Sequence, residues 1–354
     1  MRAFIQILVL VLVLVLVGSL ATLGCSGGSS DGGTAGSGGT AGSGGTGGDG
    51  GTGGAPGNSF ARLSAAQDHS CGLFRDGSVD CWGSDTHAGD ATPIGFAFED
   101  IQTATTYSCA IQTEGPTECW GEGQGTVVPD GELFESIALG FDHACGQRAD
   151  GTVRCWGGES DDEGCGAPQL NCGQGVSPAG TFNQIVAGHY SNCGLTTSGT
   201  VACWGAGQTD DSISPNWGQG IEPAGTFESI FAGVWHYCAL DASGAATCWG
   251  AGTTTGSCGG SNLNCGQATP PDETNFKTLG LGWLHSCGVR MDDSTVCWGT
   301  DRLGSGDLEP PQGAVFEQLT AGKNHSCGVE QDGTAVCWGF VPCGGAGEEA
   351  CGAP

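Results

Sequence analysis

Positive charge is scarce in this sequence. Nine Lys and Arg residues stand against 38 Asp and Glu residues in 354 positions, which gives a formal net charge of -29 at pH 7. A surface of this sign repels phosphate backbones and anionic lipid headgroups. We therefore expect no nucleic-acid partner and no anionic membrane surface as a partner, and we interpret the acidity as a means of keeping the protein soluble.

Recognisable catalytic and metal-binding patterns are also lacking. The chain contains no His-Glu-x-x-His, no phosphate-binding glycine loop and no Ser-His-Asp spacing. Two acidic loops are candidates for Ca²⁺, but neither has an ordered ligand spacing; they contain Asp161, Asp162 and Glu163, and Asp210 and Asp211. We expect no catalytic residue, no bound metal and no cofactor.

The sequence has a single long apolar run, and it is too short to cross a membrane. Ile7 to Val17 are apolar without interruption, whereas a spanning helix needs about 20 such residues. Arg2 precedes the run and small residues follow it, which is typical of an exported chain's signal peptide over residues 1–24. Cys25 comes next, and the pattern resembles a bacterial lipobox, although Thr22 stands where Leu is usual.

That resemblance implies that Cys25 is the lipid attachment site and the mature N-terminus. Ser26 beside it is compatible with an outer-membrane or cell-surface lipoprotein. The alternative is ordinary signal cleavage followed by secretion. Residues 25–59 then form the anchor and a linker of Gly, Ser, Thr and Ala, which is too poor in apolar side chains to fold.

A 24-residue unit repeats seven times in residues 60–354. Each copy begins with Phe, has Cys eleven and twenty-one residues later, and ends in Trp-Gly; the copies start at Phe60, Phe98, Phe134, Phe182, Phe227, Phe276 and Phe316. Segments of 12 to 25 residues separate them. Repeats of about 42 residues have the period of a four-stranded propeller blade.

The two cysteines of each copy fit one β-hairpin. In the first copy, a three-residue loop at Arg75-Asp76-Gly77 puts Cys71 opposite Cys81 on one face. The third loop residue must be left-handed, and it is Gly in six copies and Asp293 in the other. Directly opposed residues are close enough for a disulfide.

We therefore predict one cross-strand disulfide in each repeat. The pairs are Cys71-Cys81, Cys109-Cys119, Cys145-Cys155, Cys193-Cys203, Cys238-Cys248, Cys287-Cys297 and Cys327-Cys337. Three more pairs fall in the variable segments: Cys165-Cys172, Cys258-Cys265 and Cys343-Cys351. Zinc is the alternative, but zinc sites prefer a closer Cys spacing.

The unit resembles the repeat of the regulator-of-chromosome-condensation family in a cysteine-bearing, bacterial form. In the last copy the match rests on Ala321-Gly322, His325, Asp332-Gly333 and Trp338-Gly339. The resemblance implies an all-β, seven-bladed propeller. We expect Phe, the Ile or Leu three residues later and all seven tryptophans of Trp-Gly to pack between blades, and the ring to close by pairing strands near Phe60 with those of the last copy.

Histidine occupies one equivalent position in five copies, two residues before the first Cys. These residues are His69, His143, His236, His285 and His325, while Tyr107 and Ser191 take the position in the other copies. A ring of imidazoles is an alternative metal site. We interpret the position as a structural hydrogen bond.

The pair of residues before that position varies most within the unit. Copies three to six place an aromatic residue there, namely Phe141, Tyr190, Trp235 and Trp283, and Trp217 lies in a neighbouring variable loop. Equivalent positions share one propeller face, so we predict an arc of exposed aromatic residues suited to binding. The alternative is that these rings fold down onto their own blades.

These features predict a monomeric, non-catalytic propeller that binds an extracellular protein or glycan through one face. The alternatives are a structural component of the cell envelope and a hydrolase or lyase with a site assembled from distant blades. Nucleotide exchange on a small GTPase, the activity of the family's eukaryotic founder, disagrees with export and acidity.

Overall fold

Strands make up almost all of the regular structure. The computed structural model describes residues 59–83, 93–158, 172–208, 217–253, 263–272, 275–301, 304 and 306–340. All of them belong to one unit of the chain, Asp49–Pro354. The predicted signal peptide, Cys25 and nearly all of the linker lie outside the described residues. Within the described part of the chain, no helix has the length and apolar character needed to cross a membrane.

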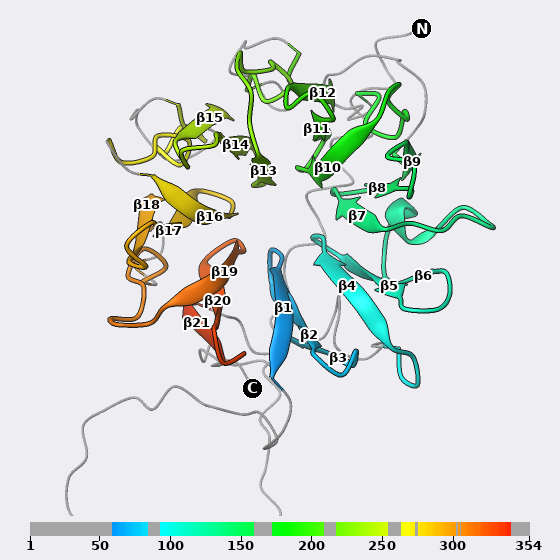
Figure 1. Ribbon diagram of the computed structural model, residues 1–354, viewed down its shortest axis with the longest axis horizontal. Helices are drawn as coiled ribbons and strands as arrows, with labels where there is room; N and C mark the ends of the chain where they lie inside the picture. The colour runs from blue at the N-terminus through cyan, green and yellow to red at the C-terminus, as the bar shows by residue number, and fades with distance from the viewer. Residues whose placement is uncertain are drawn as a thin grey trace, which may run out of the picture. The chain divides into compact units, whose positions relative to one another are not determined.

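Each repeat folds into its own antiparallel sheet, so the seven predicted blades are confirmed. The strands are β1 (Phe60–Ala65), β2 (His69–Phe74), β3 (Val79–Gly83), β4 (Phe98–Thr103), β5 (Tyr107–Gln112), β6 (Thr117–Gly121), β7 (Ser136–Leu139), β8 (His143–Gln147), β9 (Val153–Gly157), β10 (Phe182–Ala187), β11 (Ser191–Thr196), β12 (Val201–Gly205), β13 (Ser229–Ala232), β14 (His236–Leu240), β15 (Ala246–Gly250), β16 (Phe276–Leu281), β17 (His285–Arg290), β18 (Thr295–Gly299), β19 (Phe316–Ala321), β20 (His325–Glu330) and β21 (Ala335–Gly339). A short 3-10 helix, η2 (Gln124–Thr126), precedes β7. The sheets form a ring with the first strand of each blade innermost (Figure 1).

The expectation of four strands per blade was wrong for the described residues. Each sheet contains three strands, in the order of the sequence. The 24-residue unit supplies all three, and a fourth would have to come from the variable segments, whose sequences share no strand pattern. Within the described residues, the 24-residue unit therefore forms the blade by itself.

The hairpin geometry is confirmed in all seven blades. Cys71 pairs directly with Cys81 across β2 and β3, and each repeat contains a disulfide whose Cα atoms lie 4.0 or 4.1 Å apart. The third loop residue has positive φ in every copy, including 70° at Asp293. Cys172 and Cys265 are also disulfide-bonded. The predicted partners of these two, and both cysteines of the pair Cys343-Cys351, lie outside the described residues.

The core lies between blades, as the repeat predicts. At the first junction, Cys71 and Leu73 of one blade pack against Phe98, Ile101 and Trp120 of the next, and equivalent clusters fill the other junctions. All seven tryptophans pack against the clusters between blades, as predicted, and five of them are buried. Trp82 and Trp204 are only half-buried.

A hydrogen bond also crosses every junction at the position that usually holds histidine. Four of these bonds join the histidine Nε2 to a serine hydroxyl of the next blade: His69 to Ser108, His236 to Ser286, His285 to Ser326 and His325 to Ser70. The Nε2 of His143 donates to Asn192 at 2.9 Å. All five histidines are fully buried, so the structural interpretation agrees with the geometry.

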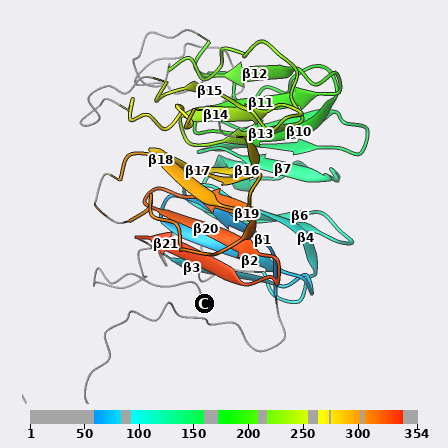
Figure 2. The same cartoon turned by 60° about the vertical axis from the view of Figure 1, so that its left-hand side comes forward.

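Among the described strands, the ring closes by packing and individual hydrogen bonds and not by strand pairing, which differs from the sequence-based expectation. β1 pairs only with β2, and it lies beside β19 in both views (Figures 1 and 2). The side chain of Gln318 accepts from Leu63 N at 3.0 Å and donates to Leu63 O at 2.8 Å. Phe60 N donates to Gly333 O at 2.8 Å. The last junction thus uses the same kinds of contact as the others.

Candidate binding site at the mouth of the channel

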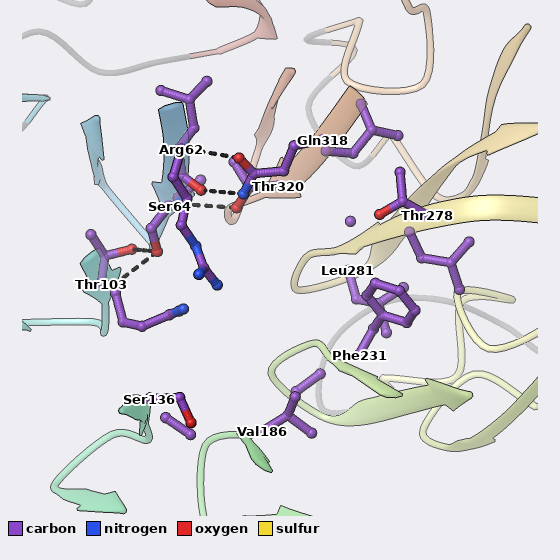
Figure 3. Close-up of a pocket in the computed structure, with 18 of the residues that line it drawn as sticks. Arg62, Ser64, Thr103, Ser136, Val186, Phe231, Thr278, Leu281, Gln318 and Thr320 are labelled. Carbon is purple, nitrogen blue, oxygen red and sulfur yellow. Dashed lines mark hydrogen bonds between the residues drawn. The ribbon is translucent and has the colours of Figure 1, made fainter. Parts of the chain in front are cut away.

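A channel runs through the centre of the ring, lined by the innermost strands of all seven blades. Its volume is about 730 Å³. Arg62, Ser64 and Thr320 lie on one side of the channel, and Phe231 and Leu281 lie on the other (Figure 3). The larger apolar side chains of the lining therefore lie on blades 4 to 6, next to the polar Asn183, Gln184 and Thr278, whereas blades 7, 1 and 2 contribute mostly polar groups.

A second, smaller cavity forms the mouth of this channel, at the end where the first and second strands of each blade connect. It measures about 180 Å³ and includes residues from every blade. The mouth and the channel share six lining residues, which we call the throat: Ala65, Thr103, Ala187, Ala232, Leu281 and Ala321. Four of the six are alanines, so the two cavities adjoin where the side chains are small.

The variable pair of each repeat divides into two structural roles. The first residue of the pair lines the mouth in all seven copies: Gln67, Thr105, Phe141, His189, Val234, Trp283 and Lys323. All seven are half-buried. The second residue of each pair is not part of the mouth lining. Phe141 and Trp283 therefore reach the mouth, whereas Tyr190 and Trp235 do not.

The predicted arc of exposed aromatic residues is not exposed. Tyr190, Trp217 and Trp235 are 5 to 9% exposed and pack together in one cluster, which Phe141 and Trp283 join from its edge. We call these five residues the rim cluster. The rings bury apolar area against each other, and that is more favourable than leaving them in water. The five residues do gather at one face, as expected, but Tyr190, Trp217 and Trp235 form a supporting layer behind the mouth, and only Phe141 and Trp283 line it.

Trp217 is buried because its loop closes on itself and docks on the next blade. Its backbone N donates to the side-chain oxygen of Gln219 at 2.6 Å. The carbonyl of Gln219 then accepts from Nε1 of Trp249 at 2.9 Å. Trp217 has a structural role in this arrangement.

His189 is the mouth residue that sequence reasoning missed. Its ring lies 4.3 Å from Phe141, 4.5 Å from Tyr190 and 4.9 Å from Trp235, centroid to centroid. Burial among these rings lowers the pKa of His189 to about 3, so the imidazole is neutral at pH 7. The signal that could have found it was the separation of each variable pair into a first and a second residue.

Backbone hydrogen bonds tie the apolar half of the mouth together. Phe141 N donates to His189 O at 3.1 Å, and His189 N donates to Val234 O at 2.9 Å. The chain of bonds continues from Val234 to Gly282 and from Trp283 to Gly322. These loops therefore hold their side chains in a fixed arrangement over blades 3 to 7.

Lys323 supplies the charge at the mouth. Its Nζ lies 4.8 Å from the centroid of the Trp283 ring and 4.0 Å from a carboxylate oxygen of Asp68. Nε1 of Trp283 is buried and has no hydrogen-bond partner among the described residues. The mouth thus combines an aromatic surface, an unpaired donor and a partly neutralised cation.

The described residues contain no metal centre. No group of three or more His, Cys, Asp or Glu side chains in that part of the chain is placed to hold a metal ion. The two acidic loops considered for Ca²⁺ lie outside it.

Comparisons with known proteins agree with this fold. Residues 62–88 and 134–165 match the regulator of chromosome condensation (RCC1) repeat family. No curated protein matches this sequence significantly.

Solved structures resemble the chain over most of its length. The ectodomain of the receptor kinase CR4 from Physcomitrella patens is 22% identical, with 81% of this chain and 75% of that chain covered and a TM-score of 0.61. The ectodomain of the Arabidopsis thaliana receptor kinase ACR4 is 24% identical, with 82% and 100% covered and a TM-score of 0.59. Human WBSCR16 is 12% identical, with 77% and 87% covered and a TM-score of 0.56. At these identities the similarity establishes the fold alone.

Proposed function

We propose that this protein is a non-catalytic binding propeller that holds an extracellular ligand at the mouth of its channel. One observation carries the proposal: the most variable position of the repeat comes from all seven blades to line a single cavity. Repeat proteins with a constant framework and variable residues on one surface use that surface for recognition.

The supporting layer fits a binding role. The rim cluster and the backbone bonds between loops fix Phe141 and Trp283 before a ligand arrives. Preorganised aromatic side chains lose little entropy on binding, so they contribute strongly to affinity. The two plant structures of the same fold are receptor ectodomains, which supports a ligand-binding or scaffold role.

The chemistry of the mouth favours binding over catalysis. No carboxylate is among the described residues that line it, and His189 is too weak a base near pH 7 because its pKa is lowered to about 3. The five histidines two residues before the first Cys are buried and hydrogen-bonded between blades. A general acid and a general base within reach of one bound group are what a hydrolase would need.

The location we propose is the cell surface. The seven disulfides are typical of a protein that folds in an oxidising compartment. Lipid attachment at Cys25, with residues 26–59 as a tether, would hold the propeller away from the membrane. Mass spectrometry of the intact purified protein would detect the added mass of the lipid.

Capture experiments test the function. The purified full-length protein, its Trp283→Ala and Phe141→Ala variants and a Phe96→Ala control are used to capture surface-labelled cell-envelope material. Phe96 is 50% exposed near the start of β4, far from the mouth along the strand. We expect both mouth variants to lose capture and the control to keep it. Equal capture by all four folded proteins would contradict a mouth site.

A further inference from the structure

The mouth and the channel have the same two-sided character along their full depth. The apolar groups on one side are Phe141, Val234 and Trp283 at the mouth and Val186, Phe231 and Leu281 in the channel (Figure 3), and the uncharged polar side chains His189, Gln184 and Thr278 lie among them. The polar side presents hydroxyl and amide groups at both levels: Gln67, Thr105, Ser64, Thr103, Gln318 and Thr320. A ligand that follows this path must itself carry apolar and polar faces along its length.

The charges on the polar side are neutralised within the protein. Arg62 Nη1 lies 2.6 Å from Asp100 Oδ1, and Lys323 is paired with Asp68. Glu317 carries a further charge at the start of β19, the end of the channel away from the throat. In a chain with a formal net charge of -29, the path from the mouth through the throat is electrically balanced. It therefore suits an uncharged ligand, because a charged one would have to break an existing ion pair to find a partner.

The aromatic side favours groups with weakly positive C–H surfaces. The face of an aromatic ring carries partial negative charge, and Lys323 already uses this property of Trp283. The C–H face of a sugar ring is polarised in the same sense, while the edge of the sugar carries hydroxyls that can bond amides and hydroxyls on the opposite side. A pyranose therefore matches both sides of the path.

The dimensions favour a chain end. The mouth of about 180 Å³ is smaller than the roughly 300–1,000 Å³ that encloses a whole drug-sized ligand. Four of the six throat residues beyond it are alanines, so few side-chain atoms narrow the passage there. The terminal unit of a linear chain can enter the mouth and pass into the throat, with the rest of the chain in line behind it. A branched or folded ligand is too wide to enter in this way.

We propose that the ligand is the end of a neutral oligosaccharide chain, which enters the mouth with its sugar faces against Phe141 and Trp283. This inference rests on the proposed function, because it assigns the ligand class of the same site. The recognition is by stacking and hydrogen bonds, without net charge.

A glycan-binding measurement tests the proposal directly. The full-length protein is titrated with linear oligomers of two to six units of glucose, galactose, mannose and N-acetylglucosamine, and with sialylated and sulfated oligomers for comparison. We expect at least one neutral series to bind. Blocking one end of that oligomer with a bulky group should weaken binding at least about tenfold, while blocking the other end should have little effect.

Matched variants place the sugar. Trp283→Ala removes the stacking surface, and Ala65→Phe narrows the throat at a half-buried position; each should weaken binding at least about tenfold in a protein whose melting temperature shows that it is folded. Phe96→Ala should bind as the unaltered protein does. Undiminished binding by both the Trp283→Ala and the Ala65→Phe proteins would overturn the proposal.

The two hypotheses can fail separately. Binding only to sialylated or sulfated oligomers, or to none of the panel, overturns the neutral-glycan inference. If envelope proteins are then captured by the unaltered chain and lost by Trp283→Ala, the binding function stands with a protein ligand. If neither sugars nor proteins depend on the mouth, both hypotheses are wrong.

Discussion

The position two residues before the first cysteine determines how each pair of blades meets. Four of the five histidines have Gly three residues earlier, and that Gly leaves room for the ring: a Cβ on Gly140 would lie 1.9 Å from Cε1 of His143, and one on Gly322 would lie 2.4 Å from Cε1 of His325. Before His69 the same position is Ala66, so the glycine is common at this position but not obligatory. The imidazole lies over the glycine and reaches across to the next blade.

Acid should weaken the fold through these histidines. Burial lowers the pKa of His143, His285 and His325 to about 4 and that of His236 to about 3. The unfolded chain binds protons near pH 6.5, so the stabilising contribution is complete above that pH and is lost as the pH falls toward 4. The free energy of unfolding should drop by up to about 3 kcal/mol per histidine over this range. Urea unfolding at a series of pH values measures it.

His143→Gln is the matched control for the acid effect. It should be less stable than the unaltered protein at pH 7, because a buried contact is altered, but its stability should fall less steeply between pH 6.5 and 4. An identical pH profile for the two proteins would show that the buried histidines do not cause the acid sensitivity.

The junction between blades 4 and 5 also has a hydrogen bond across it, but here the small residue is on blade 4 and the large one is on blade 5. Ser191 is too short to reach the next blade, and Tyr237 reaches back instead: its hydroxyl donates to Ser191 O at 2.7 Å and accepts from Gly188 N at 3.0 Å. Tyr237→Phe should lower the free energy of unfolding by about 1 kcal/mol, because the bonds of that hydroxyl are lost while Gly188 N and Ser191 O keep their bond to each other at 2.9 Å. The double variant Ser191→His, Tyr237→Ser recreates the common pair and should recover part of the loss. Chemical denaturation measures both, and a Tyr237→Phe protein of unchanged stability would contradict the assignment.

Among the elements, the hairpin of the sixth blade is the one that departs from the rule. Asp293 has φ of 70° where the other six copies have Gly. A side chain in this region is strained by about 1 kcal/mol, so Asp293→Gly should raise the melting temperature. Asp293 also pairs with Lys277, but that pair is exposed and adds little.

Two further variants separate strain from charge at this turn. Both Asp293→Asn and Asp293→Ala remove the ion pair. Asn tolerates the left-handed region, whereas Ala does not. Thermal unfolding should give the highest melting temperature for the Gly variant, a lower one for Asn and the lowest for Ala. If Asn and Gly both melt below the unaltered protein, the ion pair outweighs the strain.

The hairpins were predictable from the sequence because every determinant is local. The ten-residue separation of Cys71 and Cys81 and the Gly at the turn together determine the strand register, the turn conformation and the disulfide. No information from other blades is needed. The seven copies then gave the number of blades. The tryptophans were also placed correctly between blades, because the repeat puts them on the face that a neighbouring blade covers.

The site was less predictable because it depends on contacts between different repeats. Phe141 and Tyr190 occupy neighbouring positions of the variable pair, yet one lines the mouth and the other lies behind it. That division follows from how loops of adjacent blades bond and stack, which no single repeat encodes. The number of strands per blade was also hard to predict from one repeat. The repeat length suggested four, but the 24-residue unit contains three, and only the variable segments could have supplied a fourth.

At the scale of the molecule, one junction differs from the others because no chain segment links its two blades directly. Gln318 bonds both backbone groups of Leu63 there, and Gln184 bonds both backbone groups of Ile230 at a junction that is linked by the chain. Gln318→Ala should speed amide exchange of Leu63 by about tenfold through local opening of the ring. Gln184→Ala should give less acceleration at Ile230. Equal effects in hydrogen-exchange mass spectrometry would mean that the closing junction is no weaker.

The disulfides have a consequence for how the ring comes apart. Each one joins residues ten positions apart within a single blade, so none of the seven clamps one blade to another. Under a pulling force the chain should peel away blade by blade, and every released blade should keep a closed loop that does not extend. Each loop would withhold about 35 Å of contour length, given at most about 3.6 Å per residue. Reduction would return that hidden length, so tension and redox state together would set how far the protein can stretch.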